Sequence, residues 1–203
     1  CVAILLATRK LHEAFVALRD RRSAVLTALA GVLILFNWGI FVFATQTGHV
    51  VDAALGYFIN PLVTALLGVI ILRERLRPAQ WTALGLGVIA VVVLVVGYGQ
   101  FPWIALGLAF SFGFYGLVKK ALGQMPALTG LTLETLWVTP LAVALLVWIG
   151  LSDGLAIATG DVRLVLFMSL AGAVTSVPLL LFAAATRRLP LSTVGLLQYL
   201  NPI

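Results

Sequence analysis

The stretch VDAALGYFINPLVTALLGVIILRERLRP, residues 51–78, contains the pattern on which the fold of this chain depends. Its apolar part, residues 51–72, is long enough to cross the hydrocarbon core of a bilayer as an α-helix. Three arginines follow at Arg73, Arg75 and Arg77. Because Lys and Arg in short loops stay on the cytoplasmic side, this stretch is predicted to run from outside to inside.

The same pattern of an apolar span and a short connection recurs along the whole chain. The spans are apolar on all sides and lack the alternation of a membrane barrel, which predicts an all-α, polytopic membrane helix bundle. We expect residues 1–8 to end an earlier span and Leu191–Ile203 to begin a later one, so that the chain is a fragment truncated at both ends. The six predicted full spans are Val25–Gln46, Val51–Leu72, Trp81–Val96, Phe101–Val118, Leu128–Leu151 and Leu164–Ala185.

The basic residues predict how these spans are threaded. Of the 13 Lys and Arg residues, only Arg163 falls in a connection that this topology places outside. Every connection therefore agrees with a span 25–46 that runs from inside to outside, each later span being reversed. The basic residues placed inside are Arg9, Lys10, Arg19, Arg21, Arg22, Arg73, Arg75, Arg77, Lys119, Lys120, Arg187 and Arg188.

The composition supports a lipid environment. The chain is 62% hydrophobic and 10% charged, whereas a soluble domain has roughly 45–50% apolar and about 25% charged residues. Its mean hydropathy is +1.14. The net charge of +6 would suggest nucleic acid on a soluble face, but here the charges lie between spans. We therefore expect the lipid bilayer as a partner and no nucleic acid. Cys1 is the single cysteine, so the sequence predicts no disulfide framework.

An internal repeat relates the two parts of the chain at a shift of 141 residues, the difference between positions 60 and 201. The spans of the two copies are five apart, an odd number, so the copies have opposite orientations. Inverted repeats are typical of secondary transporters, whose substrate site lies near the bilayer midplane. Chance similarity between apolar helices is the alternative explanation. The matched positions are Leu29-Ala30-Gly31 with Leu170-Ala171-Gly172, Phe41 with Phe182, Ala44-Thr45 with Ala185-Thr186, Leu55 with Leu196, and Asn60-Pro61 with Asn201-Pro202.

Four runs of sequence resemble the RarD group of the EamA family, in the drug/metabolite transporter superfamily. The resemblance implies ten helices built as two inverted five-helix halves, in a bacterial inner-membrane exporter or permease. Many members of the family have glycine before the acid at Glu74, where this chain has Arg73. The runs are LGYFINPL at 55–62, ALGLAFSF at 105–112, FYGLV at 114–118 and ETLW at 134–137.

This resemblance also implies a division of the chain between the two halves. Residues 1–98 would hold the end of the second helix and helices 3–5 of the first EamA half. Residues 99–203 would hold helices 6–8 and the start of helix 9 of the second half.

Ala105, Ala109 and Gly113 recur every four residues, which predicts a small-residue face for close helix packing.

Glu134 is the acid that lies well inside an apolar span. An ionisable group at that depth is costly, so it is a candidate for binding a substrate amine or for carrying a coupling proton. The alternative is an interfacial acid near Lys119 and Lys120 that holds the loop. Neither histidine lies mid-span, so the sequence predicts no metal site and no cofactor.

Three asparagines are the other mid-span polar candidates. Asn60 and Asn201 form a symmetric pair, and each precedes a proline that disturbs helix hydrogen bonding and frees backbone carbonyls. Asn37, with Trp38 beside it, is the second polar position. These residues are predicted to line a substrate pathway; the alternative for the asparagines is hydrogen bonding between helices.

Four further aromatic side chains complete the predicted substrate-binding set. They could stack on an aromatic or amphipathic solute, or they could belong to the aromatic belt at the membrane interface. The four residues are Tyr57, Tyr115, Trp137 and Tyr199.

The leading functional hypothesis is a secondary-active transporter of small metabolites or drug-like compounds that works by alternating access. The chain contains no GxxxxGK[ST] pattern for ATP hydrolysis, so coupling is expected to come from a proton or solute gradient, with protons as the first coupling ion to test. The sequence predicts a multi-pass protein of the bacterial inner membrane, not an enzyme, and leaves a homodimer open as its assembly. The alternatives are an intramembrane enzyme and a membrane scaffold without solute flux.

Overall fold

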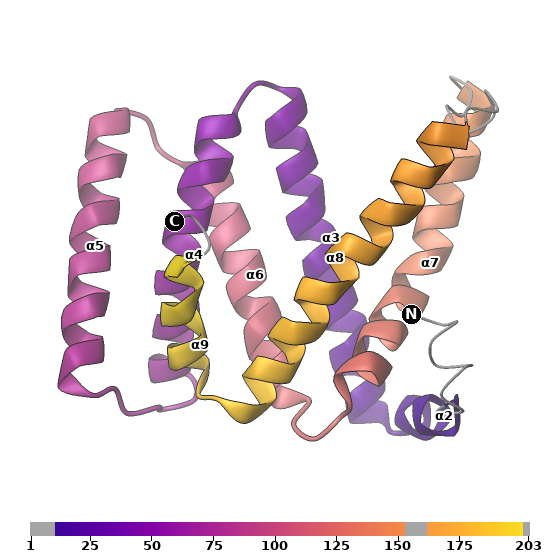
Figure 1. Cartoon of the computed structure of the whole chain (residues 1–203), viewed down its shortest axis with the longest axis horizontal. Coiled ribbons are helices and arrows are strands. Elements are labelled where there is room, and N and C mark those ends of the chain that lie inside the picture. Colours follow the sequence, from indigo (N-terminus) through magenta and orange to yellow (C-terminus); the bar gives the residue numbers. More distant parts are fainter. Residues whose placement is uncertain (1–10, 153–161, 201–203) are drawn as a thin grey trace. The chain divides into compact units, whose positions relative to one another are not determined.

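The computed structural model describes residues 11–152 and 162–200, and within these ranges the regular structure is entirely helical (Figure 1). Long helices alternate with short connections, as predicted. The helices are α2 (Leu11–Arg19), α3 (Arg21–Gln46), α4 (Val50–Ile70), α5 (Pro78–Tyr98), α6 (Trp103–Ala121), α7 (Ala127–Ser152), α8 (Val162–Arg188) and α9 (Leu191–Leu197), followed by the 3₁₀ turn η2 (Gln198–Leu200).

All six predicted spans are confirmed as helices. Among the described residues, α3 to α8 are six helices long and apolar enough to cross a membrane. Their ends differ from the predicted ends by a few residues: α3 begins earlier, at Arg21, whereas α4 ends at Ile70 and α6 begins at Trp103, both inside the predicted spans. The predicted span end within residues 1–8 lies outside the described residues, as do the last three residues of Leu191–Ile203.

Helix α2 was not predicted, because its residues fall in a charged connection. It is nine residues long, too short to span a bilayer. Asp20 separates it from α3 and caps that helix: the Ser23 N–H donates to the Asp20 carboxylate over 3.0 Å. Hydrogen bonds from the side chain and backbone of Ser23 lower the pKa of Asp20 below its ordinary value.

The chain divides into two compact units that do not follow the order of the sequence. One comprises Cys1–Gly31 and Gln124–Ala184, and the other comprises Val32–Gly123 and Ala185–Ile203. The second unit therefore joins α4 and α5 to α6 and α9, which come from opposite sides of the predicted boundary at 98/99. The predicted boundary at 98/99 divides the chain by sequence repeat, whereas the two units divide it by packing. The predicted boundary therefore stays a prediction.

In the first unit, α2 and α7 pack through a small apolar cluster around Leu133, which is 1% exposed. Ala17 and Leu18 of α2 contact it, as do Met125 and Leu128. The cluster explains why the charged connection forms a helix: helix α2 places apolar side chains on one face and buries part of them.

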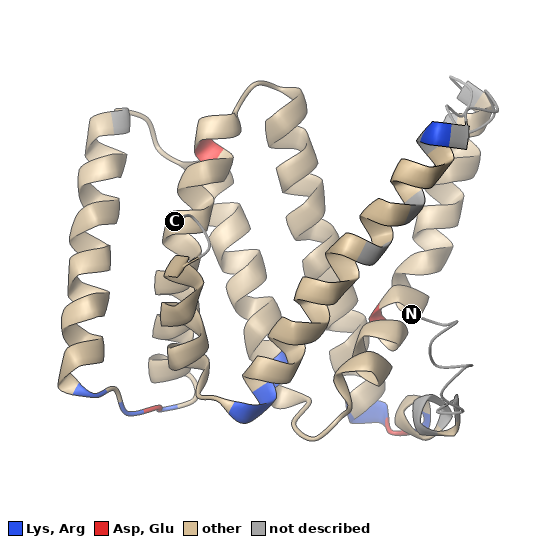
Figure 2. Cartoon of the chain, viewed as in Figure 1, with Lys and Arg blue, Asp and Glu red and all other residues tan. Residues whose placement is uncertain are grey.

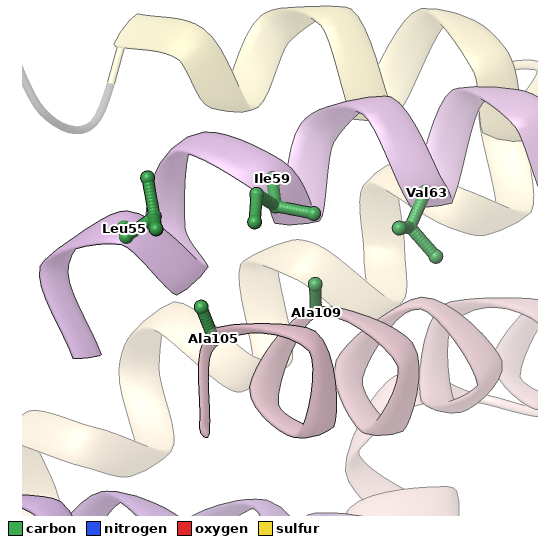
Figure 3. Packing of buried hydrophobic residues seen from close by; sticks show 5 residues of the cluster. All are labelled: Leu55, Ile59, Val63, Ala105 and Ala109. Atoms are coloured by element: carbon green, nitrogen blue, oxygen red, sulfur yellow. The ribbon is translucent and has the colours of Figure 1, made fainter. Parts of the chain in front are cut away.

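In the second unit, α4 and α6 form the core (Figure 3). Ala105 and Ala109 of α6 are fully buried against Leu55, Ile59 and Val63 of α4. A Cβ atom added at Gly113 would lie 2.8 Å from Val63 Cγ1. The predicted small-residue face is thus confirmed: it lets the two helices approach closely where lipid supplies no hydrophobic driving force.

Helix α9 lies alongside α4 in the same unit and also packs through glycines (Figure 1). A Cβ atom added at Gly195 would lie 2.7 Å from the backbone nitrogen of Ala65 and 2.9 Å from the carbonyl oxygen of Pro61. One added at Gly68 would lie 2.7 Å from the backbone nitrogen of Ser192. The backbones of α4 and α9 therefore touch at two successive positions.

Replacing Gly195 with alanine is expected to destabilise the protein by roughly 1–3 kcal/mol, because the new methyl group overlaps backbone atoms that cannot move independently. Gly85→Ala in α5 is the matched control, since a Cβ there meets nothing within 4 Å. That variant is expected to be neutral or slightly more stable, owing to the better helix propensity of alanine. Chemical unfolding of the full-length protein in detergent measures both. Equal effects of the two changes would contradict the packing described.

The charges of the second unit follow the predicted topology. Basic residues of the α4–α5 connection, of the last turn of α6 and of the last turn of α8 lie at the same end of the unit (Figure 2). The connection between α3 and α4 contains no Lys or Arg. Within this unit, the alternation of basic and uncharged connections therefore corresponds to two ends of one helix bundle, as expected for membrane-spanning helices.

Candidate functional site

A polar cluster links α4 to the end of α9 in the second unit. The side-chain amide of Asn60 donates to Gln198 Oε1 over 3.0 Å, and the Thr64 hydroxyl donates to Asn60 Oδ1 over 3.3 Å. Pro61 follows inside α4 and has no N–H, so the helix loses one backbone hydrogen bond there. Asn60 thus joins α4 to the 3₁₀ turn after α9, next to the proline that interrupts the backbone hydrogen bonds of α4, as the alternative of helix-to-helix hydrogen bonding requires.

The buried end of this cluster has donors that lack a partner among the described residues. Gln198 Nε2 and the Tyr199 hydroxyl are both buried without a hydrogen-bond partner there. Tyr199 packs against α5, since a Cβ atom added at Gly87 would lie 2.5 Å from its hydroxyl oxygen. The predicted Tyr199 is therefore brought into the same unit as Asn60, but its hydroxyl points at a helix backbone.

Asn37 forms a second polar link, between α3 and α6. Its amide nitrogen donates to the carbonyl oxygen of Leu108 over 3.0 Å and to Ser111 Oγ over 2.8 Å. The Ser111 hydroxyl donates to the same carbonyl over 3.1 Å. The three groups form a closed hydrogen-bonded set, which holds α3 and α6 in register within the apolar part of the unit.

Three aromatic rings run from α3 to α4. Trp38 meets Phe41 edge to face with ring centroids 6.0 Å apart, and Phe41 meets Tyr57 in the same way at 6.3 Å. Trp38 is 43% exposed and Tyr57 is 54% exposed. The structure therefore joins two of the predicted aromatic residues through Phe41, and it leaves both about half exposed.

Tyr115 differs from these exposed aromatics because it is fully buried in α6. The ammonium group of Lys119 lies 5.3 Å from the centroid of its ring, a cation–π arrangement. The ring of Phe112 lies 5.7 Å away. The burial of Tyr115 distinguishes it from the lipid-facing aromatics of an interfacial belt.

The remaining candidates belong to the first unit or lie outside the described residues. Glu134 is in the second turn of α7 and only 2% exposed. Its backbone is approached by α3: a Cβ atom at Gly31 would lie 3.0 Å from the Glu134 carbonyl oxygen. Trp137, one turn further along α7, is 47% exposed. Asn201 lies outside the described residues, so its predicted pairing with Asn60 stays a prediction.

The α4–α5 connection holds the beginning of α9 through Glu74. One carboxylate oxygen accepts the Leu191 N–H over 2.8 Å, and the other accepts the Ser192 N–H over 2.8 Å and the Ser192 hydroxyl over 2.7 Å. Gln80 adds a bond from its amide nitrogen to Thr193 Oγ1 over 3.3 Å. Glu74 thereby satisfies two of the backbone donors that the start of α9 leaves open, those of Leu191 and Ser192.

Arg73 precedes this carboxylate with a φ of 55°, the one left-handed non-glycine residue in the described chain. Such a conformation costs an L-residue about 1–2 kcal/mol, whereas glycine adopts it freely. A glycine would adopt this conformation without strain. Here the chain keeps the left-handed conformation with an arginine.

Several residues of these clusters were missed by the sequence analysis. Their small or common side chains stand out only when a partner from another helix is known. Glu74 gave the clearest signal, an acid within a row of arginines, and Gln198 gave a weaker one, an amide within an apolar segment. The missed residues are Phe41, Thr64, Glu74, Ser111 and Gln198.

These elements define a polytopic α-helical membrane protein whose spans are joined by buried polar contacts. The described residues contain no group of three His, Cys, Asp or Glu side chains that could hold a metal ion. A model of the EamA-like transporter family matches residues 1–96. No solved structure matches the chain.

Curated relatives extend the match over almost the whole chain. Protein RarD of Streptomyces exfoliatus is 47% identical over 199 residues, which are 98% of this chain and 63% of the relative. Protein RarD of Salmonella typhimurium is 44% identical over 201 residues, 99% of this chain and 68% of the relative. The uncharacterized transporter YojE of Bacillus subtilis is 44% identical over 86% of this chain and 57% of its own length.

The chain belongs to the RarD group of the EamA-like transporter family, within the drug/metabolite transporter superfamily. It spans about two thirds of the length of the two RarD relatives, 63% and 68%. The predicted resemblance is thus confirmed, and the protein is a multi-pass membrane protein of a transporter family.

Proposed function

We propose that the full-length protein is a secondary-active transporter of small metabolites or drug-like compounds in the bacterial inner membrane, working by alternating access. The observation that carries the proposal is membership of a transporter family in a chain with six membrane-competent helices. Uncharacterized transporters of Bacillus subtilis and Pseudomonas aeruginosa are both 44% identical to it. A further Pseudomonas aeruginosa relative, 31% identical, is named chloramphenicol-sensitive protein RarD.

The helix boundaries support an inverted repeat of two five-helix halves. Helix α4 begins at residue 50 and helix α9 begins at residue 191. The two starts differ by 141, the shift that aligns the two copies of the sequence. The agreement of this helix start with the sequence repeat supports a repeat over chance similarity of apolar spans. The orientation of the two copies rests on the basic connections.

In this proposal, polar and aromatic side chains of the spans contact the solute. Trp38 and Tyr57 are about half exposed, and Asn37 and Asn60 lie at polar helix contacts. Glu134 is a buried acid within a span and would carry the coupling proton. Tyr115, Trp137, Tyr199 and Asn201 complete the proposed set. The proposal leaves the assembly as a monomer or a homodimer to be measured.

Flux through the purified full-length protein in proteoliposomes tests the proposal. With an imposed pH gradient, we expect gradient-dependent movement of at least one compound from a panel of amino acids, other amines and amphipathic drugs, chloramphenicol included. Empty liposomes and vesicles without a gradient are the controls. Flux that is absent across the panel favours the scaffold. Hydrolysis of a compound by the detergent-solubilised protein favours the enzyme.

A further inference from the structure

The α4–α5 connection, residues 73–77, presents two different faces. Glu74 and Leu76 point toward the protein: Glu74 binds the start of α9, and Leu76 packs on the cluster of Leu62, Ala65 and Leu84. The residues between them, Arg73, Arg75 and Arg77, are all exposed. Since every second side chain is anchored inside, the three guanidinium groups are held outward from one short segment.

This row of arginines has no neutralising partner in the described part of the chain, where none of the three forms an ion pair. The nearest acid in sequence, Glu74, is occupied by the backbone and hydroxyl of α9. Guanidinium groups bind phosphate oxygens through paired hydrogen bonds, and they do so best where other charges do not compete. The arginine row therefore fits an anionic phosphate group.

The surroundings of the row are those of a membrane interface. Ile70 and Ile71, at the end of α4, are 70% and 50% exposed. Trp81, in the first turn of α5, is 51% exposed. Exposed apolar residues on both sides of a basic segment are typical of the depth at which lipid headgroups meet acyl chains, and tryptophan prefers that depth.

Arg73 gives a separate reason to expect a ligand. Its left-handed backbone would cost glycine nothing, yet the chain has arginine there. Strained backbone conformations persist only when the surrounding structure over-determines them, and they cluster at functional sites such as ligand clamps. A phosphate bound by the Arg73 guanidinium would offset that strain.

We propose that Arg73, Arg75 and Arg77 form a binding site for the headgroups of anionic phospholipids in the cytoplasmic leaflet. The bound lipid holds the connection in the conformation in which Glu74 and Gln80 fasten α9. The site needs no solute flux, so it stands independently of the proposed transport.

Thermal unfolding of the purified full-length protein in neutral detergent, titrated with phosphatidylglycerol, tests the site. Phosphatidylglycerol is expected to raise the melting temperature more than phosphatidylcholine or inorganic phosphate, and high salt is expected to weaken the effect. In the variant Arg73→Gln/Arg75→Gln/Arg77→Gln, the apparent affinity for phosphatidylglycerol should fall at least about tenfold. The matched control Arg19→Gln/Arg21→Gln/Arg22→Gln removes the same charge from another exposed inside connection and should respond like the wild type.

Three results would overturn the site: a wild-type protein that responds equally to both lipids, a Gln variant that keeps the wild-type response, or a control that loses as much. If the triple variant does not fold, Arg75→Gln/Arg77→Gln takes its place, with an expected loss of at least about threefold. The version with three lysines keeps the charge that sets topology, and it should retain a measurable part of the response.

Discussion

Replacing Glu74 with alanine is expected to release the start of α9 and to lower the free energy of unfolding by about 2 kcal/mol. The carboxylate accepts three hydrogen bonds, from the Leu191 N–H, the Ser192 N–H and the Ser192 hydroxyl, at 2.7–2.8 Å. Bonds to a charged acceptor are the stronger kind, and their loss leaves the backbone donors of a helix start without a protein partner. Unfolding of the full-length protein in detergent measures the loss.

Local measurements distinguish this clamp from a general loss of stability. Hydrogen exchange of the Leu191 and Ser192 amides should accelerate more in Glu74→Ala than exchange in the α4–α6 core. Glu74→Gln keeps an acceptor oxygen but loses the charge, so its effect should be intermediate. Gln46→Ala, at an exposed position at the end of α3, is the control. If Glu74→Ala left both stability and exchange unchanged, the three hydrogen bonds would not fasten α9.

Replacing Glu134 with glutamine in the full-length protein is expected to abolish transport driven by a pH gradient. Glutamine has nearly the same shape, but it cannot bind and release a proton. Glu134 lies in the second turn of α7 and is 2% exposed. A proton that it binds and releases would therefore be exchanged inside the protein and not with bulk water. Uptake into proteoliposomes under an imposed pH gradient measures the effect.

The conservative variant Glu134→Asp keeps an acid at the same position and should retain gradient-driven flux with an altered pH profile. Solute exchange without a gradient separates the two roles of the residue. An acid that only carries the proton should permit exchange in the Gln variant, whereas an acid that also binds the solute should not. Unchanged gradient-driven flux in Glu134→Gln, with a normal pH profile, would remove Glu134 from the mechanism.

The six full spans could be predicted from the sequence because their signal is local. An apolar stretch of sufficient length must form a helix in lipid, where each backbone polar group needs a partner within its own segment. The small-residue face of Ala105, Ala109 and Gly113 was predictable for a related reason: regular spacing puts these residues on one side of one helix. Helix α2 was not predicted because its charged residues outweigh its short apolar face in the hydropathy pattern of the sequence.

The polar contacts of the candidate site could be predicted only in part. Asn37, Asn60 and Glu134 stand out as polar groups in apolar spans, and the structure places the two asparagines in contacts between helices. Their partners Ser111 and Gln198 lie 74 and 138 residues away in the sequence. No local pattern marks such a partner, because a serine or glutamine becomes significant only when another helix brings a polar group to it.

The sequence alone predicted the all-helical class, the number of full spans and the side of the membrane on which the basic connections lie. Lipid imposes these features on any chain with this hydropathy and charge. The pairing of helices came from the fold: α4 lies against both α6 and α9, and an acid amid arginines turns inward to hold α9. Pairing depends on the shapes of two surfaces at once, where glycines admit a backbone and a carboxylate meets free N–H groups. The sequence of one segment therefore does not show which other helix it will pack against.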